Sequence, residues 1–433
     1  MGAVIMPKII VIGGGWAGCA AALAAAKAGS EVTLIEKTDM LLGTGLVGGI
    51  MRNNGRFTAT EEMIALGGGD LFELCDRTSR HKNINFPGHE HASLYDILTT
   101  PVEVLQFIYK LGVNIQFESR VTKIHKEAGK ILAVEDQDGK KYQGDTFVDA
   151  TGTAGPMNHC RKYGNGCAMC ILRCPSYGGR ISITSLAGIN EMVGKKENGS
   201  IGAMSGSCKI CKDSLSKEIQ KILDDSGVAI VNIPEELKED HLEIKACQQY
   251  AMKEFKDNVI LLDTGHAKLM APFYSLDRLR KIPGFENARY EDPYAAGKGN
   301  SIRFLGISPH DNSLKVTGLD NLFCAGEKIG PFIGHTEAIV TGTLAGHNAA
   351  RSAFGLDALE LPKELAVGDA IAYIGEEINT GKGLYKKYTF SGSIYFERMK
   401  EKKLYSTDIS EVRERVFKLG YENVFNKKLA KQR

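Results

Sequence analysis

Cysteine is concentrated in the middle of the chain, where its spacing suits metal or redox chemistry. Six of the ten cysteines lie between residues 160 and 211. The run Cys167-Ala-Met-Cys170-Ile-Leu-Arg-Cys174-Pro has the C-x2-C-x3-C-P spacing of a ferredoxin ligand run, and Cys208 and Cys211 form a second close pair. We expect a 4Fe–4S cluster on these five cysteines, with zinc, a redox disulfide or ordinary buried thiols as the alternatives.

A glycine-rich turn near the start of the chain has the spacing of a dinucleotide-binding motif. The stretch Gly13-Gly14-Gly15-Trp16-Ala17-Gly18 satisfies G-x-G-x-x-G. Gly13 permits the tight turn, Gly15 lets a pyrophosphate approach the backbone, and Gly18 lets a helix pack closely on a sheet. Glu36 follows Gly18 at the distance expected for an acid that accepts hydrogen bonds from the adenosine ribose, and we place Lys37 in the same site.

The elements around this turn must position it, and the sequence predicts them in the required order. The apolar run from Lys8 to Gly13 favours a buried parallel strand, and the alanine-rich run from Cys19 to Ala28 favours a helix. Residues 31–36 favour a second strand that ends in Glu36. A strand, a glycine turn, a helix, a strand and an acid in this order predict a dinucleotide site rather than a structural turn.

Two distant segments separate FAD from NAD as the expected cofactor. Residues 146–152 predict a strand that ends in Ala-Thr151-Gly152, and residues 319–327 predict a strand that ends in Ala-Gly326-Glu327. With these elements the chain resembles flavoproteins that have two dinucleotide-binding folds. The resemblance implies that these four residues contact FAD, with Glu327 on the ribityl chain, and that a helix over residues 341–351 points its N-terminus at the flavin.

Polar residues near this predicted flavin are the candidates for catalysis. His335 precedes the helix and is expected to donate a proton or contact the flavin, while Thr336 is expected to touch the cofactor or cap the helix. Arg52 and Asn53 follow a glycine-rich stretch that such folds bring to the cofactor. We therefore take His335, Asn53 and Arg52 as catalytic candidates.

Residues 279–288 and 334–351 look like the corresponding segments of the GidA/TrmFO family. That resemblance implies an FAD enzyme that modifies uridines in RNA. The folate-dependent members carry a catalytic cysteine soon after the second strand, whereas residues 48–55 of this chain contain none. Our main prediction is therefore an FAD-dependent oxidoreductase coupled to a cysteine-bound iron–sulfur or thiol centre. The alternative is an FAD-dependent RNA uridine-modifying enzyme related to GidA/TrmFO.

The composition indicates a globular protein, with 43% hydrophobic and 24% charged residues in 433. We predict an α/β fold in which a Rossmann-like, glutathione-reductase-type FAD domain comprises residues 1–155 and 315–355. An inserted cysteine-rich substrate domain spans 156–314, and a basic helical extension spans 356–433. The last 52 residues hold 14 Lys and Arg against 6 Asp and Glu, so RNA is a possible partner of this tail.

Other partners and the location of the protein are also expectations at this point. A flavin and a redox-active centre imply a small-molecule or protein redox partner. An apolar stripe on a helix that begins at Asp408 would dock on its own protein or on a second subunit of a homo-oligomer. No uncharged apolar stretch predicts a membrane span, and no signal peptide is evident, so we expect a cytoplasmic protein.

Overall fold

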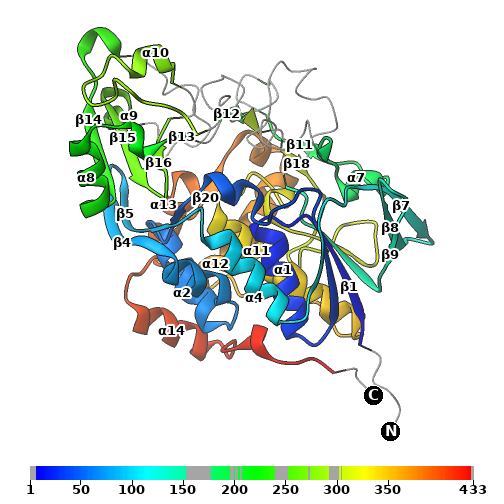
Figure 1. Cartoon of the computed structure of the whole chain (residues 1–433). Coiled ribbons are helices and arrows are strands. Elements are labelled where there is room, and N and C mark those ends of the chain that lie inside the picture. Colours follow the sequence, from blue (N-terminus) through cyan, green and yellow to red (C-terminus); the bar gives the residue numbers. More distant parts are fainter. Residues whose placement is uncertain are drawn as a thin grey trace.

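The computed structural model describes residues 6–152, 177–195, 199, 203–204, 207–238, 252–271, 274–291, 302–303 and 305–430 (Figure 1). Its centre is a five-stranded parallel sheet in the order β19-β10-β1-β2-β6. The strands are β1 (Lys8–Ile12), β2 (Glu31–Ile35), β6 (Asn114–Gln116), β10 (Thr146–Asp149) and β19 (Leu322–Cys324). This arrangement confirms the predicted α/β fold, and it places the segments after β1, β10 and β19 side by side at one edge of the sheet.

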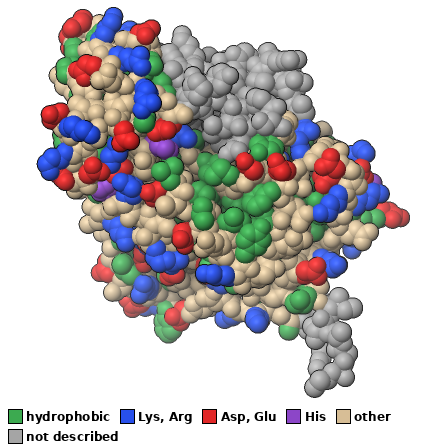
Figure 2. Space-filling model, in the orientation of Figure 1, with side chains coloured by type: hydrophobic (Ala, Val, Ile, Leu, Met, Phe, Trp, Pro, Cys, Tyr) green, Lys and Arg blue, Asp and Glu red, His purple; other side chains and the backbone are tan. Residues whose placement is uncertain are grey.

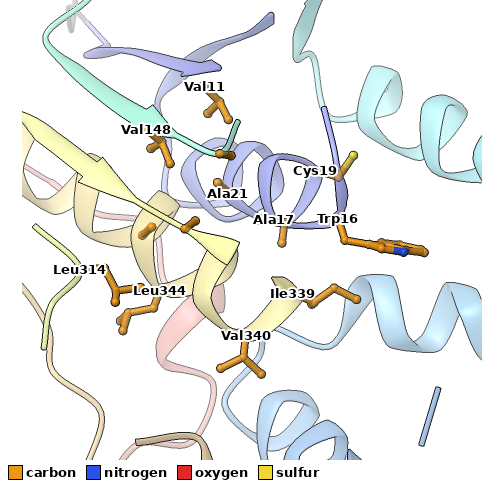
Figure 3. Close-up of a cluster of buried hydrophobic side chains, with 14 of the residues drawn as sticks. Val11, Trp16, Ala17, Cys19, Ala21, Val148, Leu314, Ile339, Val340 and Leu344 are labelled. Carbon is orange, nitrogen blue, oxygen red and sulfur yellow. The ribbon is translucent and has the colours of Figure 1, made fainter. Parts of the chain in front are cut away.

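Two long helices cover this sheet and contact each other closely. They are α1 (Trp16–Lys27) and α11 (His335–Ala353). A Cβ placed on Gly342 would lie 2.1 Å from the carbonyl oxygen of Ala17, so only glycine permits this approach of the two backbones. Figure 3 shows the apolar core that results, with Val11 and Val148 of the sheet beside α1 and the α11 side chains. Glycine at position 342 of α11 therefore permits the close approach of this helix to α1.

Further helices and two small antiparallel sheets extend the part of the chain around the central sheet. The helices are α2 (Gly55–Ala65), α3 (Asp70–Arg77) and α4 (Thr100–Lys110). One sheet has the order β3-β5-β4, with β3 (Ile50–Met51), β4 (Ser79–Phe86) and β5 (His89–Tyr95). The other has the order β7-β8-β9, with β7 (Val121–Glu127), β8 (Lys130–Asp136) and β9 (Lys141–Gln143).

The insertion contains a sheet with its own apolar core, which forms the upper left lobe in Figure 1. This sheet has the order β13-β16-β15-β14, with β13 (Cys208–Ile210), β14 (Val228–Asn232), β15 (Asn258–Asp263) and β16 (Ala267–Leu269). Helices α8 (Lys217–Ser226), α9 (Lys253–Asp257) and α10 (Leu276–Leu279) accompany it. Ile50 and Leu94 of the β3-β5-β4 sheet share a cluster with Ile260, so the lobe is anchored on the first half of the chain.

Short elements connect this lobe to the main sheet. They are α7 (Ile183–Leu186) and two ladders, β11 (Met192–Val193) with β18 (Gly306–Ile307) and β12 (Ala203–Met204) with β17 (Ile302–Arg303). No helix among the described residues is both long and apolar enough to cross a bilayer.

The C-terminal elements pack into the main core. They are α12 (Ala366–Asn379), β20 (Tyr388–Thr389), α13 (Ser393–Glu401) and α14 (Ile409–Lys418). Side chains of α12 and α13 belong to the same apolar cluster as the central sheet. Asp408 accepts hydrogen bonds from the backbone N–H groups of Ser410 and Glu411, which is the cap expected at the start of α14. The inward residues Val412 and Val416 are fully buried, so this part of the apolar stripe docks on its own chain, whereas Ile409 is exposed.

Candidate functional site

One cleft of about 1120 Å³, including its open mouth, lies where the segments after β1, β2, β10 and β19 converge. Eight of the expected cofactor residues line it: Gly13, Gly15, Glu36, Lys37, Thr151, Gly152, Gly326 and Glu327. His335 lines the same cleft from the start of α11. Segments that are about 300 residues apart in the sequence thus form one site.

Three glycines of the first turn have distinct structural roles. Gly13 has φ +101°, and a Cβ there would lie 2.4 Å from the carbonyl oxygen of Ala150. A Cβ on Gly18, which is outside the cleft lining, would lie 1.7 Å from the carbonyl oxygen of Gly13. A Cβ on Gly15 meets no protein atom closer than the Leu42 carbonyl oxygen at 4.0 Å, although Gly15 lines the cleft. The protein therefore leaves open at Gly15 the space that a pyrophosphate would occupy.

Glu36 is buried at the end of β2, and backbone groups orient its carboxylate. Its Oε2 accepts a hydrogen bond from the N–H of Gly14 at 2.6 Å, and its Oε1 accepts one from the N–H of Thr38 at 2.8 Å. A carboxylate has about four lone-pair sites, so these bonds leave acceptor capacity for ribose hydroxyls. The same contacts fix the shape of the glycine turn.

The segments after β10 and β19 are held by polar contacts below the cleft. Asp149 is fully buried and accepts hydrogen bonds from the hydroxyl of Thr151 at 2.6 Å and from the hydroxyl of Thr184 at 2.9 Å. The N–H of Gly326 donates to the Thr341 hydroxyl at 2.9 Å, which ties this segment to α11. Lys328 is fully buried and forms an ion pair with Glu191. These contacts brace Thr151, Gly152, Gly326 and Glu327 from behind.

The shape and chemistry of the cleft fit FAD. A helix N-terminus and an unobstructed glycine backbone suit a pyrophosphate, and Glu36 suits the adenosine ribose. Arg120 and Arg180 add positive charge to the lining, where a dinucleotide carries negative charge. The N-terminus of α11 also opens onto the cleft, where its partial positive charge would stabilise a reduced flavin.

An aromatic cluster surrounds His335 at the N-terminus of α11. The Tyr95 hydroxyl lies 3.2 Å from His335 Nδ1 and donates a hydrogen bond to the carbonyl oxygen of Gly45 at 2.9 Å. The Trp16 ring meets the Tyr95 ring edge-on, with centroids 5.6 Å apart. Sequence analysis identified His335 but missed Tyr95 and Trp16, because neither spacing nor motif links them to it.

The other expected residues of this region lie beside the cleft rather than in its lining. Thr336 is buried, and its hydroxyl lies 3.6 Å from Met51 Sδ. Arg52 forms ion pairs with Glu61 and Asp76, and Asn53 is fully buried against Arg56. In the structure, Arg52 is therefore engaged in ion pairs, and Asn53 is buried and hydrogen-bonded to Arg56.

A family model described as glucose inhibited division protein A matches this chain over residues 8–271 and 269–357. These ranges cover most of the chain and include every segment that lines the cleft. The chain belongs to the GidA family. The predicted resemblance to a GidA/TrmFO-like FAD-dependent enzyme is therefore confirmed.

Curated relatives match this GidA-family chain over a short stretch. Two proteins named methylenetetrahydrofolate–tRNA-(uracil-5-)-methyltransferase TrmFO, from Enterococcus faecalis and Thermus thermophilus, are 40% and 35% identical to it over 98 and 99 residues. Each match covers 22% of this chain and 21% of the relative. The likeness to these methyltransferases thus extends over about a fifth of their length.

Solved structures match the fold over nearly the whole chain. Two crystal forms of Aquifex aeolicus GidA superpose with TM-scores of 0.70 and 0.61 at 17% and 16% sequence identity. They cover 98% and 96% of this chain, and the chain covers 74% and 79% of theirs. The arrangement of the described elements is thus the GidA fold.

The expected cysteine-bound centre finds no support in the part of the chain that the structure describes. Cys167, Cys170 and Cys174 lie outside the described residues. Cys208 points into the apolar core of the lobe, and burial raises the pKa of its thiol to about 12, which opposes the thiolate form that binds metals. Cys211 is partly exposed at the end of β13, with its Sγ 3.5 Å from the Arg289 guanidinium. No three His, Cys, Asp or Glu side chains of the described residues are placed to hold a metal ion.

A buried lysine joins the inserted lobe to the cleft and was missed by sequence analysis. Lys268 of β16 is 6% exposed, and its Nζ donates to the carbonyl oxygen of Val47 and to the Ser207 hydroxyl, both at 2.7 Å. Val47 ends η1 (Gly43–Val47), whose first residues line the cleft. Burial, together with the positive charge of Lys209, lowers the pKa of Lys268 to about 7. No motif marks this lysine in the sequence.

Proposed function

We propose that this GidA-family chain is an FAD-dependent enzyme that modifies uridine bases in tRNA. The observation that carries the proposal is the FAD-shaped cleft of a GidA-family fold, joined to segments similar to tRNA (uracil-5-)-methyltransferases. Of the two functions expected from the sequence, this one is favoured over the cysteine-coupled oxidoreductase. The named relatives act on tRNA, whereas no described metal site supports an electron-transfer centre.

In the proposed reaction, some residues of the cleft would bind FAD and others would take part in the chemistry. Gly13, Gly15 and Glu36 would hold the ADP half of FAD, and Glu327 would hold the ribityl chain. FAD, when bound, supplies two-electron chemistry at its N5 position. His335 stands at the flavin end, where it can hold or accept a proton beside the reacting base.

A catalytic cysteine is not found in the described part of the cleft wall. The lining contains no cysteine among the residues that the structure describes, and residues 48–55 have none. The run Cys167, Cys170 and Cys174 lies outside the described residues, and an iron–sulfur or zinc centre there stays a separate prediction.

We expect RNA contacts over several elements rather than on the C-terminal tail alone. Many cations of this tail are engaged within the protein: Arg398 and Lys402 pair with Asp369, and Arg415 pairs with Glu411. Figure 2 shows basic and acidic side chains interspersed over the visible face. We expect moderate RNA affinity that falls as salt rises, because each phosphate contact releases counterions.

The test uses the FAD-bound protein and an unmodified tRNA transcript. Binding is measured by fluorescence anisotropy across a salt series, and nucleosides are analysed by mass spectrometry after incubation with NADH, with and without methylenetetrahydrofolate. We expect salt-sensitive binding and a uridine-specific gain of mass. A protein that neither binds tRNA at low salt nor alters any uridine would overturn the proposal.

The variant Gly15→Ala is the matched control. Its methyl group would occupy space that FAD would fill, and it would not clash with any described protein atom. Modification should fall as this variant loses FAD, and RNA binding should remain. Modification at the wild-type rate by the variant after its FAD has been removed would show that the flavin takes no part.

A further inference from the structure

A second pocket lies between the β4–β5 hairpin and helix α13, two elements that Figure 1 shows near each other on the left of the view. Its volume is about 960 Å³, including its open mouth, and among the described residues its lining has none in common with that of the FAD cleft. Aromatic and polar side chains share its wall: Phe86, Phe396, Tyr405, Asn85, Glu90 and Lys400. The pocket is therefore separate from the site that fits FAD.

A buried asparagine builds the floor of this pocket. Asn54 is 7% exposed, and its Nδ2 donates to the carbonyl oxygens of Gly88 and Ser391 at 2.9 and 2.8 Å. Its Oδ1 accepts a hydrogen bond from the N–H of Glu90 at 2.9 Å. One side chain thus ties the start of α2, the hairpin and the segment before α13 together, so the walls of the pocket are fixed without a ligand.

Two aromatic rings form one wall of the pocket. The rings of Phe396 and Tyr405 meet at 84° with their centroids 5.1 Å apart, and both side chains are partly exposed. Because the rings are nearly perpendicular, a planar group that stacks on one ring meets the edge of the other. Phe86 adds buried apolar surface to the lining. A flat heteroaromatic ring such as a nucleobase suits this wall.

Polar groups beside this wall retain hydrogen-bonding capacity. Asn85 Oδ1 accepts a hydrogen bond from the N–H of His91 at 3.1 Å, while its Nδ2 has no hydrogen-bond partner among the described residues. The Tyr405 hydroxyl likewise bonds to no described residue, and burial raises the pKa of this tyrosine, so the hydroxyl keeps its proton at neutral pH. Both groups can therefore donate hydrogen bonds to a ligand.

Two charged side chains complete the rim. Lys400 Nζ lies 2.8 Å from the Glu397 carboxylate and 4.8 Å from the Phe396 ring centroid, and the lysine side chain is 44% exposed. An exposed ion pair of this kind is weak, so a phosphate can take the place of Glu397. The Glu90 side chain is 69% exposed, and its carboxylate would repel a free phosphate ion but accept a hydrogen bond from a sugar hydroxyl. The rim thus favours a sugar phosphate with a planar base over a bare anion.

We propose that this pocket is a second RNA subsite, in which one unpaired ribonucleotide stacks its base on Phe396 or Tyr405 and places its phosphate at Lys400. The inference rests on the proposed function and adds to it a contact with the same RNA away from the flavin. Proteins commonly recognise unpaired bases by stacking them on aromatic rings while polar side chains bind the base edges. Asn85 would donate to a base carbonyl oxygen, and Glu90 would accept a hydrogen bond from the 2′-hydroxyl that distinguishes RNA from DNA.

The experiment measures how tightly the FAD-bound protein binds a fluorescein-labelled hexauridylate, by fluorescence anisotropy at low salt. Tyr405→Leu removes a stacking surface but keeps apolar bulk, and it should weaken binding about tenfold. Lys400→Gln removes one phosphate contact, so it should weaken binding several-fold and make it less steeply dependent on salt. Hexadeoxyuridylate should bind the wild-type protein several-fold more weakly than the RNA, and unlabelled uridine monophosphate should be a much weaker competitor than unlabelled hexauridylate.

Two variants outside the pocket are the matched controls. Tyr109→Leu changes a half-exposed tyrosine of α4, and Lys418→Gln changes an exposed lysine of α14 that is paired with Glu414, so neither should alter binding. The proposal is overturned if the wild-type protein does not bind the oligonucleotide, or if Tyr405→Leu and Tyr109→Leu bind it equally well. Equally tight binding of the DNA oligonucleotide or of uridine monophosphate would also overturn it, because the pocket would then not select a nucleotide of RNA.

Ultraviolet crosslinking of the wild-type complex locates the contact without any variant. Mass spectrometry of the digested protein should find a uridine adduct on a peptide that contains Phe396 or Tyr405, and adducts confined to other peptides would overturn the proposal. A protein that modifies tRNA but lacks this adduct refutes the subsite alone. A protein that carries the adduct but modifies no uridine refutes the proposed function alone.

Discussion

Arg56 and Glu337 form a buried ion pair between helices that are far apart in the sequence. Arg56 Nε lies 3.1 Å from Oε1 of Glu337, and the two side chains are 7% and 0% exposed. The Thr389 hydroxyl and the Phe390 N–H also donate to this carboxylate, at 2.6 and 2.9 Å. Glu337 is in the first turn of α11, so this pair fixes the helix end that faces the cleft.

Breaking this pair from one side should be costly. We expect Arg56→Met or Glu337→Gln to lower the free energy of unfolding by about 3–5 kcal/mol, because each leaves a buried charge without its partner. The double variant should lose clearly less than the sum of the two single losses. Urea denaturation of all four proteins measures this coupling, and strictly additive losses would show that the two charges act independently.

Substitutions at Gly15 and Gly18 should separate cofactor binding from folding. Gly15→Ala should weaken FAD binding by at least about tenfold and leave the melting temperature of the apoprotein nearly unchanged, because its methyl group meets only the cofactor space. Gly18→Ala should destabilise the apoprotein by about 1–3 kcal/mol, because its methyl group overlaps the Gly13 carbonyl. Flavin fluorescence titration and thermal denaturation distinguish the two. Equal loss of stability in both variants would contradict this division.

His347 of α11 should make the protein sensitive to acid. It is fully buried beside Phe425, neither ring nitrogen has a hydrogen-bond partner among the described residues, and burial lowers its pKa to about 4. Above pH 6.5 the histidine is neutral in both states and causes no loss. As the pH falls from 6.5 to 4, the unfolded state binds a proton first, so about 3 kcal/mol of stability is lost.

The variant His347→Leu should remove this part of the acid sensitivity. The difference in unfolding free energy between variant and wild type should move in favour of the variant by about 3 kcal/mol between pH 7 and pH 4. His91→Gln, at a partly exposed histidine, is the control. A difference that is independent of pH would mean that His347 is not the titrating group.

Lys268 should matter for cofactor retention because it ties the inserted lobe to η1. Lys268→Met removes the donor to the Val47 carbonyl, and we expect the dissociation rate of FAD to rise several-fold as the loop over residues 43–47 loosens. Lys209→Met changes the neighbouring cross-strand lysine and is the matched control. Stopped-flow release of flavin measures both, and identical rates in the two variants would exclude the loop contact as the cause.

The sequence was most informative where local chemistry dictates structure. The glycine turn, β1, α1, β2 and the strands ending near Gly152 and Gly326 follow from glycine geometry and apolar runs, and the structure has them close to the expected bounds. The capping role of Asp408 was also predictable, because a cap depends on residues within one turn.

Contacts between distant segments could not be predicted in the same way. The pairing of Arg56 with Glu337 joins positions 281 residues apart, and a single sequence holds no record of such proximity. The same holds for Tyr95 with His335, and for Lys268 with Val47. Cys208 shows that a local pattern can also mislead. Its C-x-x-C spacing suggested a metal ligand, but the structure buries it in the apolar core of the lobe.

The division of the cleft between distant segments has a consequence for biosynthesis. Glu36 leaves the ribosome long before Gly326 and His335, which are about 290 and 300 residues further along the chain. At about 5–20 residues per second, roughly 15–60 seconds pass between the synthesis of Glu36 and the synthesis of the residues that complete the cleft. Flavin capture is thereby deferred until the chain has been synthesised at least as far as His335, and a polypeptide terminated before that point would emerge unable to retain the vitamin-derived cofactor.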